Sequence, residues 1–114
     1  MSLVEILVGI EKGVTSSEAK IEIEKYATDV VFDVSGKDIR LMGKISPEDL
    51  KNRFDLDVVE EGRGYRQIGV ASIPEELRRY VSFVEVIKYF DPLTKKPMTG
   101  VNHDLKGQGE LVVF

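Results

Sequence analysis

The chain of 114 residues has no cysteine, no tryptophan and a single histidine, His103. The lack of cysteine excludes disulfides, thiolate zinc sites and cysteine nucleophiles. A metal held by one histidine would also need several carboxylates, and no spacing in the sequence groups carboxylates for that purpose. We therefore expect no metal site and no cofactor, and any chemistry must use oxygen and nitrogen groups.

Long apolar runs and an excess of positive charge are also missing. No stretch approaches the roughly 18 apolar residues of a membrane-spanning helix, and the first apolar run, residues 3–10, lacks the basic flank of a signal peptide. We therefore expect a cytoplasmic chain with no membrane partner. The formal net charge of -4 argues against a general nucleic-acid binder, because neutralising phosphates takes a basic surface. A local basic patch stays open.

The overall composition is that of a folded chain, with 42% hydrophobic and 32% charged residues. At this length we expect one domain, residues 1–114. Asparagine and glutamine are scarce beside plentiful Glu, Lys, Val and Ile, which is the composition expected where thermolabile residues are avoided. This scarcity predicts a thermophilic source.

The order of elements follows from the apolar spacing. Residues 4–10 alternate as a strand does, and residues 30–45 predict a hairpin that turns at Gly36. Segment 16–27 is ambiguous. Thr15 and Glu18 form a capping box before a helical stripe, yet residues 20–24 alternate as a strand would, and good helix formers favour the helix. Residues 80–90, rich in β-branched and aromatic side chains, predict a mostly buried strand.

These elements predict an α+β fold: a mainly antiparallel sheet of about six strands, with two or three short helices on one face. Up to residue 61 the order is strand, helix, hairpin, helix, strand, which is the order of a ferredoxin-like unit. That topology hosts many functions and so predicts none.

Two stretches, 36–54 and 62–81, align with one inserted residue, Ile73. Identical pairs are Gly36/Gly62, Arg40/Arg66, Gly43/Gly69, Ser46/Ser72, Pro47/Pro74, Glu48/Glu75 and Leu50/Leu77. We interpret each stretch as a hairpin followed by a serine-capped short helix. Convergence is the alternative, because Ser, Pro and Glu begin many unrelated helices. The matched glycines and arginines upstream of the caps favour internal duplication.

Residues 91–108 form a long connection without periodicity, rich in glycine and polar side chains. Such loops beyond roughly 12 to 15 residues are usually functional, disordered or a misread element. His103 and Asp104 are the candidate catalytic residues, since histidine titrates near neutral pH and a carboxylate could orient it. They are not a preformed dyad, because neighbours on an extended loop point in different directions. Whether loop 91–108 is a site or a connection stays open.

A second candidate site consists of arginines in the two matched stretches. Arg63 lies between Gly62 and Gly64 at a predicted hairpin tip, where its planar fork could bind phosphate or carboxylate. If a pseudo-twofold axis relates the stretches, Arg40 and Arg66 could converge on one anion. The alternative is that these are solvated charges that discourage edge-to-edge aggregation. Our candidate ligand-binding residues are Arg40, Arg63, Arg66, Lys95, Lys96, Asn102 and His103.

The chain ends in an apolar segment, residues 109–114, which predicts a closing strand. It must be buried in its own sheet or against a second copy, and the second option predicts a homodimer. Our leading hypothesis is a small non-enzymatic binding or assembly module that presents hairpin tips and loop 91–108 to a protein partner or small anionic ligand. One alternative is a small enzyme or metabolite-binding protein around His103 and the hairpin arginines. The other is a weak binder of RNA or single-stranded DNA along Arg63, Tyr65 and Arg66.

Overall fold

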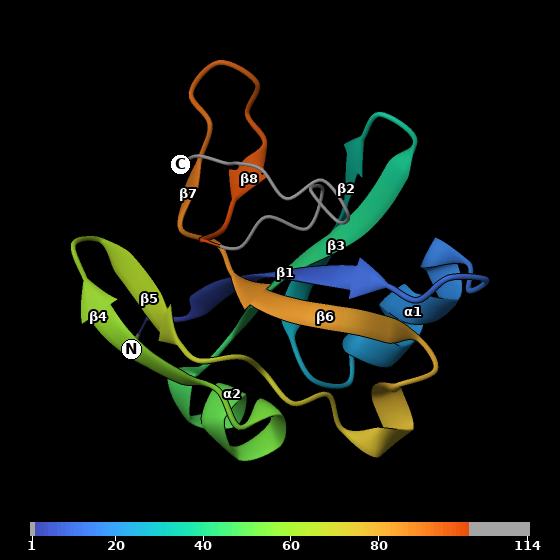
Figure 1. The fold of residues 1–114 in the computed structure, drawn as a ribbon, viewed down its shortest axis with the longest axis horizontal. Helices are drawn as coiled ribbons and strands as arrows, with labels where there is room; N and C mark the ends of the chain where they lie inside the picture. Colours follow the sequence, from blue (N-terminus) through green and yellow to red (C-terminus); the bar gives the residue numbers. More distant parts are fainter. Residues whose placement is uncertain (1, 101–114) are drawn as a thin grey trace.

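The computed structural model describes residues 2–100, which form an α+β fold as the sequence predicts (Figure 1). A four-stranded antiparallel sheet has the order β2-β3-β1-β6. Its strands are β1 (Val4–Ile10), β2 (Thr28–Ser35), β3 (Asp38–Ile45) and β6 (Val81–Val86). Two antiparallel hairpins complete the described part: β4 (Asp57–Glu61) with β5 (Gly64–Ile68), and β7 (Tyr89–Phe90) with β8 (Pro97–Met98).

Three short helices lie among the described residues, and their starts follow local chemistry. Helix α1 (Ser16–Ile23) begins at Thr15, whose side chain and that of Glu18 form the predicted capping box. Segment 16–27 is therefore helical over its first part. Helix α2 (Pro47–Phe54) begins at Ser46, whose hydroxyl accepts from the Asp49 amide. The third helix, η1 (Glu75–Leu77), is a single 3-10 turn.

The helices cover one face of the four-stranded sheet and form the core with it. Alternate residues of β1, including Ile6, are fully buried against Ile23 of α1, Phe54 of α2 and Leu77 of η1 in one apolar cluster. Full burial of each such side chain contributes about 1.5–3 kcal/mol relative to leaving it exposed. The predicted inward face of residues 4–10 is confirmed.

The predicted order of elements up to residue 61 is found, but the fourth place in the sheet differs from that of a ferredoxin-like unit. In such a unit the strand after the second helix lies beside the first strand. That strand, β4, pairs with β5 instead, and β6 occupies the place beside β1. The reason is apolar content: β6 buries Val81, Val84 and Val86, whereas β4 is half-buried to exposed. The β4–β5 hairpin is thus an insertion before the last strand of the sheet.

The two matched stretches both begin with a hairpin turn at a glycine, but the helices that follow start differently. Both hairpins turn at a glycine with positive φ, +63° at Gly36 and +62° at Gly62. After the hairpin, Ser46 caps the eight-residue α2. Ser72 does not cap η1, whose N-cap is Pro74 without a side-chain hydrogen bond. The expected second serine cap is therefore wrong, because the inserted Ile73 moves Ser72 away from the helix start.

The connection expected at 91–108 is partly ordered into the β7–β8 hairpin. Asp91 accepts hydrogen bonds from the amides of Leu93 and Thr94, at 2.8 and 3.2 Å, and so builds the turn. The first part of this connection is therefore a misread hairpin. Residues 101–108 and the closing strand expected at 109–114 lie outside the described residues. No helix within residues 2–100 is long and apolar enough to cross a membrane.

Candidate functional site

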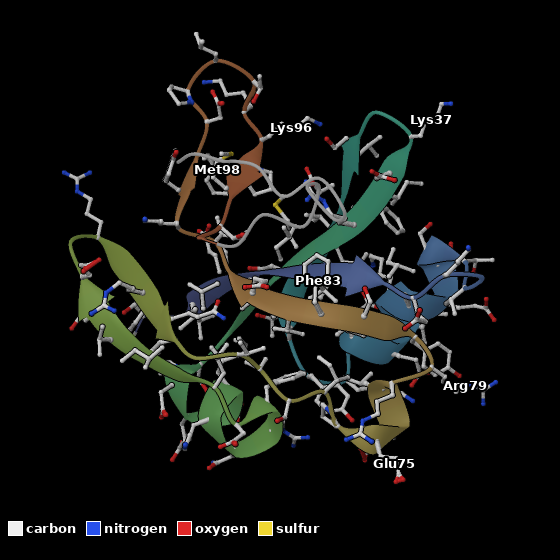
Figure 2. All side chains as sticks on the ribbon, in the orientation of Figure 1. Lys37, Glu75, Arg79, Phe83, Lys96 and Met98 are labelled. Carbon is white, nitrogen blue, oxygen red and sulfur yellow. The ribbon has the colours of Figure 1, made fainter. Side chains whose placement is uncertain are left out.

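The hairpin side of the molecule is the surface formed by the tips of β2–β3, β4–β5 and β7–β8. Figure 1 shows the β7–β8 and β2–β3 tips at the top of the view and the β4–β5 tip at its left edge, all three pointing away from α2 and η1. Figure 2 places Lys37 and Lys96 on this side and Glu75 and Arg79 on the opposite one. The Lys96 ammonium donates to the carbonyl of Val34 in β2, which ties the β7–β8 hairpin to the edge of the sheet.

Each hairpin tip carries a cation. Lys37 follows Gly36 in the β2–β3 turn, Arg63 follows Gly62 in the β4–β5 turn, and Lys95 lies in the β7–β8 turn with φ +62°. All three side chains are exposed, and none of them forms an ion pair with another residue of the range 2–100. These charges are thus available to a partner.

The larger of two hollows near these tips has a volume of about 590 Å³. It lies between the β1–α1 loop, the β2–β3 tip and the start of β6. Its charged lining residues are Glu11, Lys12, Lys37, Asp38 and Arg40. Arg40 is already neutralised, because its Nη2 is 3.0 Å from Oδ2 of Asp33, which is 7% exposed. Two lysines then face two carboxylates, so this hollow has no net preference for anions.

The second hollow, about 380 Å³, lies beside the β4–β5 tip and is called the tip hollow. Its walls come from the start of β1, the β4–β5 hairpin and the chain from β6 into β7. The charged lining residues are Glu5, Glu61, Arg63, Arg66 and Lys88. Arg66 Nε and Glu61 Oε2 are 3.1 Å apart and neutralise each other. Arg63 and Lys88 then face only Glu5, which leaves an excess of one positive charge.

Aromatic and aliphatic side chains complete the tip hollow. Tyr65, Tyr89 and Phe90 contribute rings, and Leu3 and Ile87 add aliphatic surface. Tyr89 and Phe90 are 46% and 43% exposed, which is unusual for large rings in a structure with a well-formed core. A mixed lining of apolar surface with a few cations is typical of small-ligand sites.

The predicted ligand residues do not gather in one place. Arg63 and Arg66 line the tip hollow, whereas Arg40 lines the larger one. The idea that Arg40 and Arg66 converge on one anion gains no support, since each has a carboxylate partner of its own. Lys95 and Lys96 lie on the β7–β8 hairpin. Asn102, His103 and Asp104 lie outside the described residues.

Sequence reasoning missed Lys88 and Tyr89 as site residues. The sequence predicts a mostly buried strand over 80–90, which would place both residues in the core. In the structure β6 ends at Val86, and Lys88 and Tyr89 are exposed. The signal in the sequence that could have identified them is a cation, Lys88, followed by an aromatic residue, Tyr89, at the end of an apolar run. Such a pair has no reason to lie in a core.

Among residues 2–100, the groups with shifted pKa values lie in or next to helices α1 and α2, on the helix side of the molecule. Hydrogen bonds with Thr15 lower the pKa of Glu18, and hydrogen bonds to Asp55 and Asp57 raise the pKa of Lys51. Burial raises the pKa of Tyr26, which packs against the core. These shifts follow from capping, ion pairing and burial, and they do not mark a catalytic group.

The described residues hold no group of three or more His, Asp or Glu side chains arranged to hold a metal ion. Comparisons of the chain with protein-family models, curated proteins and solved structures find no match. The function must therefore be argued from the chemistry of the hairpin side.

Proposed function

We propose that the protein is a non-enzymatic binding module that holds an anionic ligand on its hairpin side. One observation carries the proposal: three hairpin tips on one side of the molecule each end in a cation, Lys37, Arg63 or Lys95, with no ion pair among residues 2–100. Each tip is held by a backbone turn, so on binding it is mainly the side chains of these cations that remain to be ordered. The suitable ligand is a carboxylate or phosphate, either free or on the surface of a protein partner.

The acidic balance of the whole chain does not oppose this proposal. Several acidic side chains are already neutralised by ion pairs, including Glu61 on the β4–β5 hairpin and Asp33 on β2. The remaining charge on the hairpin side is set by its exposed lysines and arginines. Local charge, more than net charge, decides where an anion binds, because salt screens charges more than about 8 Å apart under physiological conditions.

Backbone amide spectra during titration with pyrophosphate, and separately with an oligoglutamate peptide, test the proposal at low salt. We expect shifts confined to residues 35–38, 62–66 and 88–96. The triple variant K37Q/R63Q/K95Q should bind at least roughly tenfold more weakly, since charged hydrogen bonds contribute about 1.5–3 kcal/mol each.

The matched control removes the same charge from the helix side. K25Q/R53Q/R79Q should bind as the wild type does, because these cations lie away from the hairpin tips. Equal losses in both triple variants would mean that only net charge matters. No shift at the hairpin tips with either probe would overturn the proposed function.

Other expectations for the whole chain stay proposals. The β2 edge, which has no neighbouring strand among residues 2–100, favours the homodimer, and the matched glycine turns at Gly36 and Gly62 favour duplication. A small enzyme around His103 and Asp104 depends on residues outside the described range. The thermophilic source and the cytoplasmic location stay predictions from composition.

A further inference from the structure

The tip hollow has the chemistry to take more than a bare anion. Resting on the proposed function, we infer that it binds a nucleotide, an aromatic base that carries a phosphate. The inference depends on three features of the hollow: aromatic rings on two walls, a cation close in the chain to a ring on each wall, and an aliphatic lining that a bare anion would not use.

The rings come from different elements. Tyr65 belongs to β5 and is half-buried, with its hydroxyl 2.9 Å from Oγ of Ser2, a hydrogen bond that orients the ring. Tyr89 belongs to β7 and is 46% exposed. Both line the same hollow. Exposed aromatic side chains are the usual platforms on which unpaired bases stack.

The cations lie next to these rings in the chain. Arg63 is two residues before Tyr65 at the hairpin tip, and Lys88 directly precedes Tyr89. A base and its phosphate are separated by one sugar, and all four residues line the same hollow, so a ring and a cation are both available to one ligand there. The β4–β5 wall of the hollow is held by the ion pair of Arg66 with Glu61.

The lining favours an aromatic anion over inorganic phosphate. Leu3 and Ile87 offer aliphatic surface that inorganic phosphate cannot contact favourably. The volume of about 380 Å³ lies within the roughly 300–1,000 Å³ of small-ligand pockets. By contrast, the larger hollow beside the β2–β3 tip has balanced charges and only one large ring, that of Phe83.

A free nucleotide and a single strand of RNA share this chemistry. A smaller hollow of about 270 Å³ is also lined by Tyr65, Arg66, Val86 and Lys88, so the two hollows adjoin. That arrangement gives a second nucleotide of a strand a place beside the first.

Calorimetric titration of the full chain at low salt with ribose 5-phosphate, adenosine 5′-monophosphate and a short oligoadenylate tests the inference. Adenosine 5′-monophosphate should bind about tenfold more tightly than ribose 5-phosphate, because stacking of one base is worth roughly that factor. Oligoadenylate that binds more tightly than the mononucleotide identifies a strand as the ligand. Equal affinities identify a free nucleotide.

Tyrosine variants test whether the preference for a base comes from these rings. Tyr89→Leu should remove the preference for the base and leave the affinity for ribose 5-phosphate unchanged, while Tyr89→Phe should keep it. Tyr89 is chosen because it is exposed, whereas Tyr65 packs against the core. Tyr65→Leu, studied at a temperature where it is folded, is the second variant.

The outcomes separate this inference from the proposed function. Equal binding of adenosine 5′-monophosphate and ribose 5-phosphate would overturn the nucleotide site and leave the anion-binding module standing. If neither binds and pyrophosphate also fails to shift the hairpin tips, both proposals are wrong. A base preference that survives Tyr89→Leu and Tyr65→Leu would place the base elsewhere and overturn the site.

Discussion

Gly9 in β1 is a residue at which the sheet tolerates no side chain. A Cβ at this position would lie 2.2 Å from Cε2 of the Phe83 ring and 2.6 Å from Oγ of Ser82. Phe83 is its partner in register on β6, and the register shifts directly after Gly9. The glycine thus lets the Phe83 ring lie across β1 on the face opposite the helices, as Figure 2 shows.

Gly9→Ala should destabilise the protein by about 1–3 kcal/mol, because the new methyl overpacks the contact with Phe83. Urea unfolding followed by circular dichroism measures the change. Gly64→Ala is the matched control in another strand, since a Cβ there has no atom within 4 Å. Equal stability of Gly9→Ala and the wild type would show that the ring moves aside without cost.

At the scale of elements, the two matched stretches use the same residue types differently. Ser46 accepts a hydrogen bond from the Asp49 amide at 3.0 Å and begins α2, whose Leu50 and Phe54 are fully buried. The amide of Ser72 donates to the carbonyl of Phe54 at 2.7 Å, so Ser72 joins its segment to the end of α2 through its backbone. Among the described contacts, only Ser46 caps a helix with its side chain.

Ser46→Ala should therefore cost about 1 kcal/mol, the usual loss for an N-cap serine. Ser72→Ala should change the free energy of unfolding by less than about 0.5 kcal/mol, as for an ordinary exposed position. Thermal and urea unfolding of the pair measure this difference. Equal losses would contradict the asymmetry between α2 and η1 and favour a second serine cap.

At the scale of the whole molecule, the two edges of the four-stranded sheet differ. The β6 edge is screened by the β4–β5 hairpin, where the Gln67 amide oxygen accepts from the Val86 amide at 2.9 Å. The β2 edge has no neighbouring strand within residues 2–100. It exposes Val31, Phe32 and Val34 at 49%, 44% and 52%. An apolar edge of this kind is a natural place for a second copy to pair.

We therefore expect light scattering to show a dimer at micromolar concentration. Phe32→Lys with Val34→Lys should shift the equilibrium to monomer, because two like charges on one face of the edge strand oppose pairing with a second copy. Val70→Lys is the control, since Val70 is 82% exposed and lies just after β5, which contacts β6 at the other edge of the sheet. A wild-type chain that remains monomeric, or a dimer unaffected by both edge substitutions, would contradict pairing at β2.

The sequence by itself determined the local elements of this protein. The Thr15 and Glu18 box, the Gly36 and Gly62 turns and the Ser46 cap act between residues close in the chain, so their patterns can be read directly. The same holds for Arg63, which any turn between two glycines would expose.

Tertiary structure alone decided which strand completes the sheet and which side chains share a hollow. β6, and not β4, lies beside β1 because β6 buries more apolar surface there. Which of the two strands takes that edge depends on how both pack against the rest of the fold. Arg63 and Lys88 are far apart in the chain and meet at the tip hollow because the inserted hairpin lies against the end of β6. Contacts between distant segments depend on the whole packing, which local spacing does not encode.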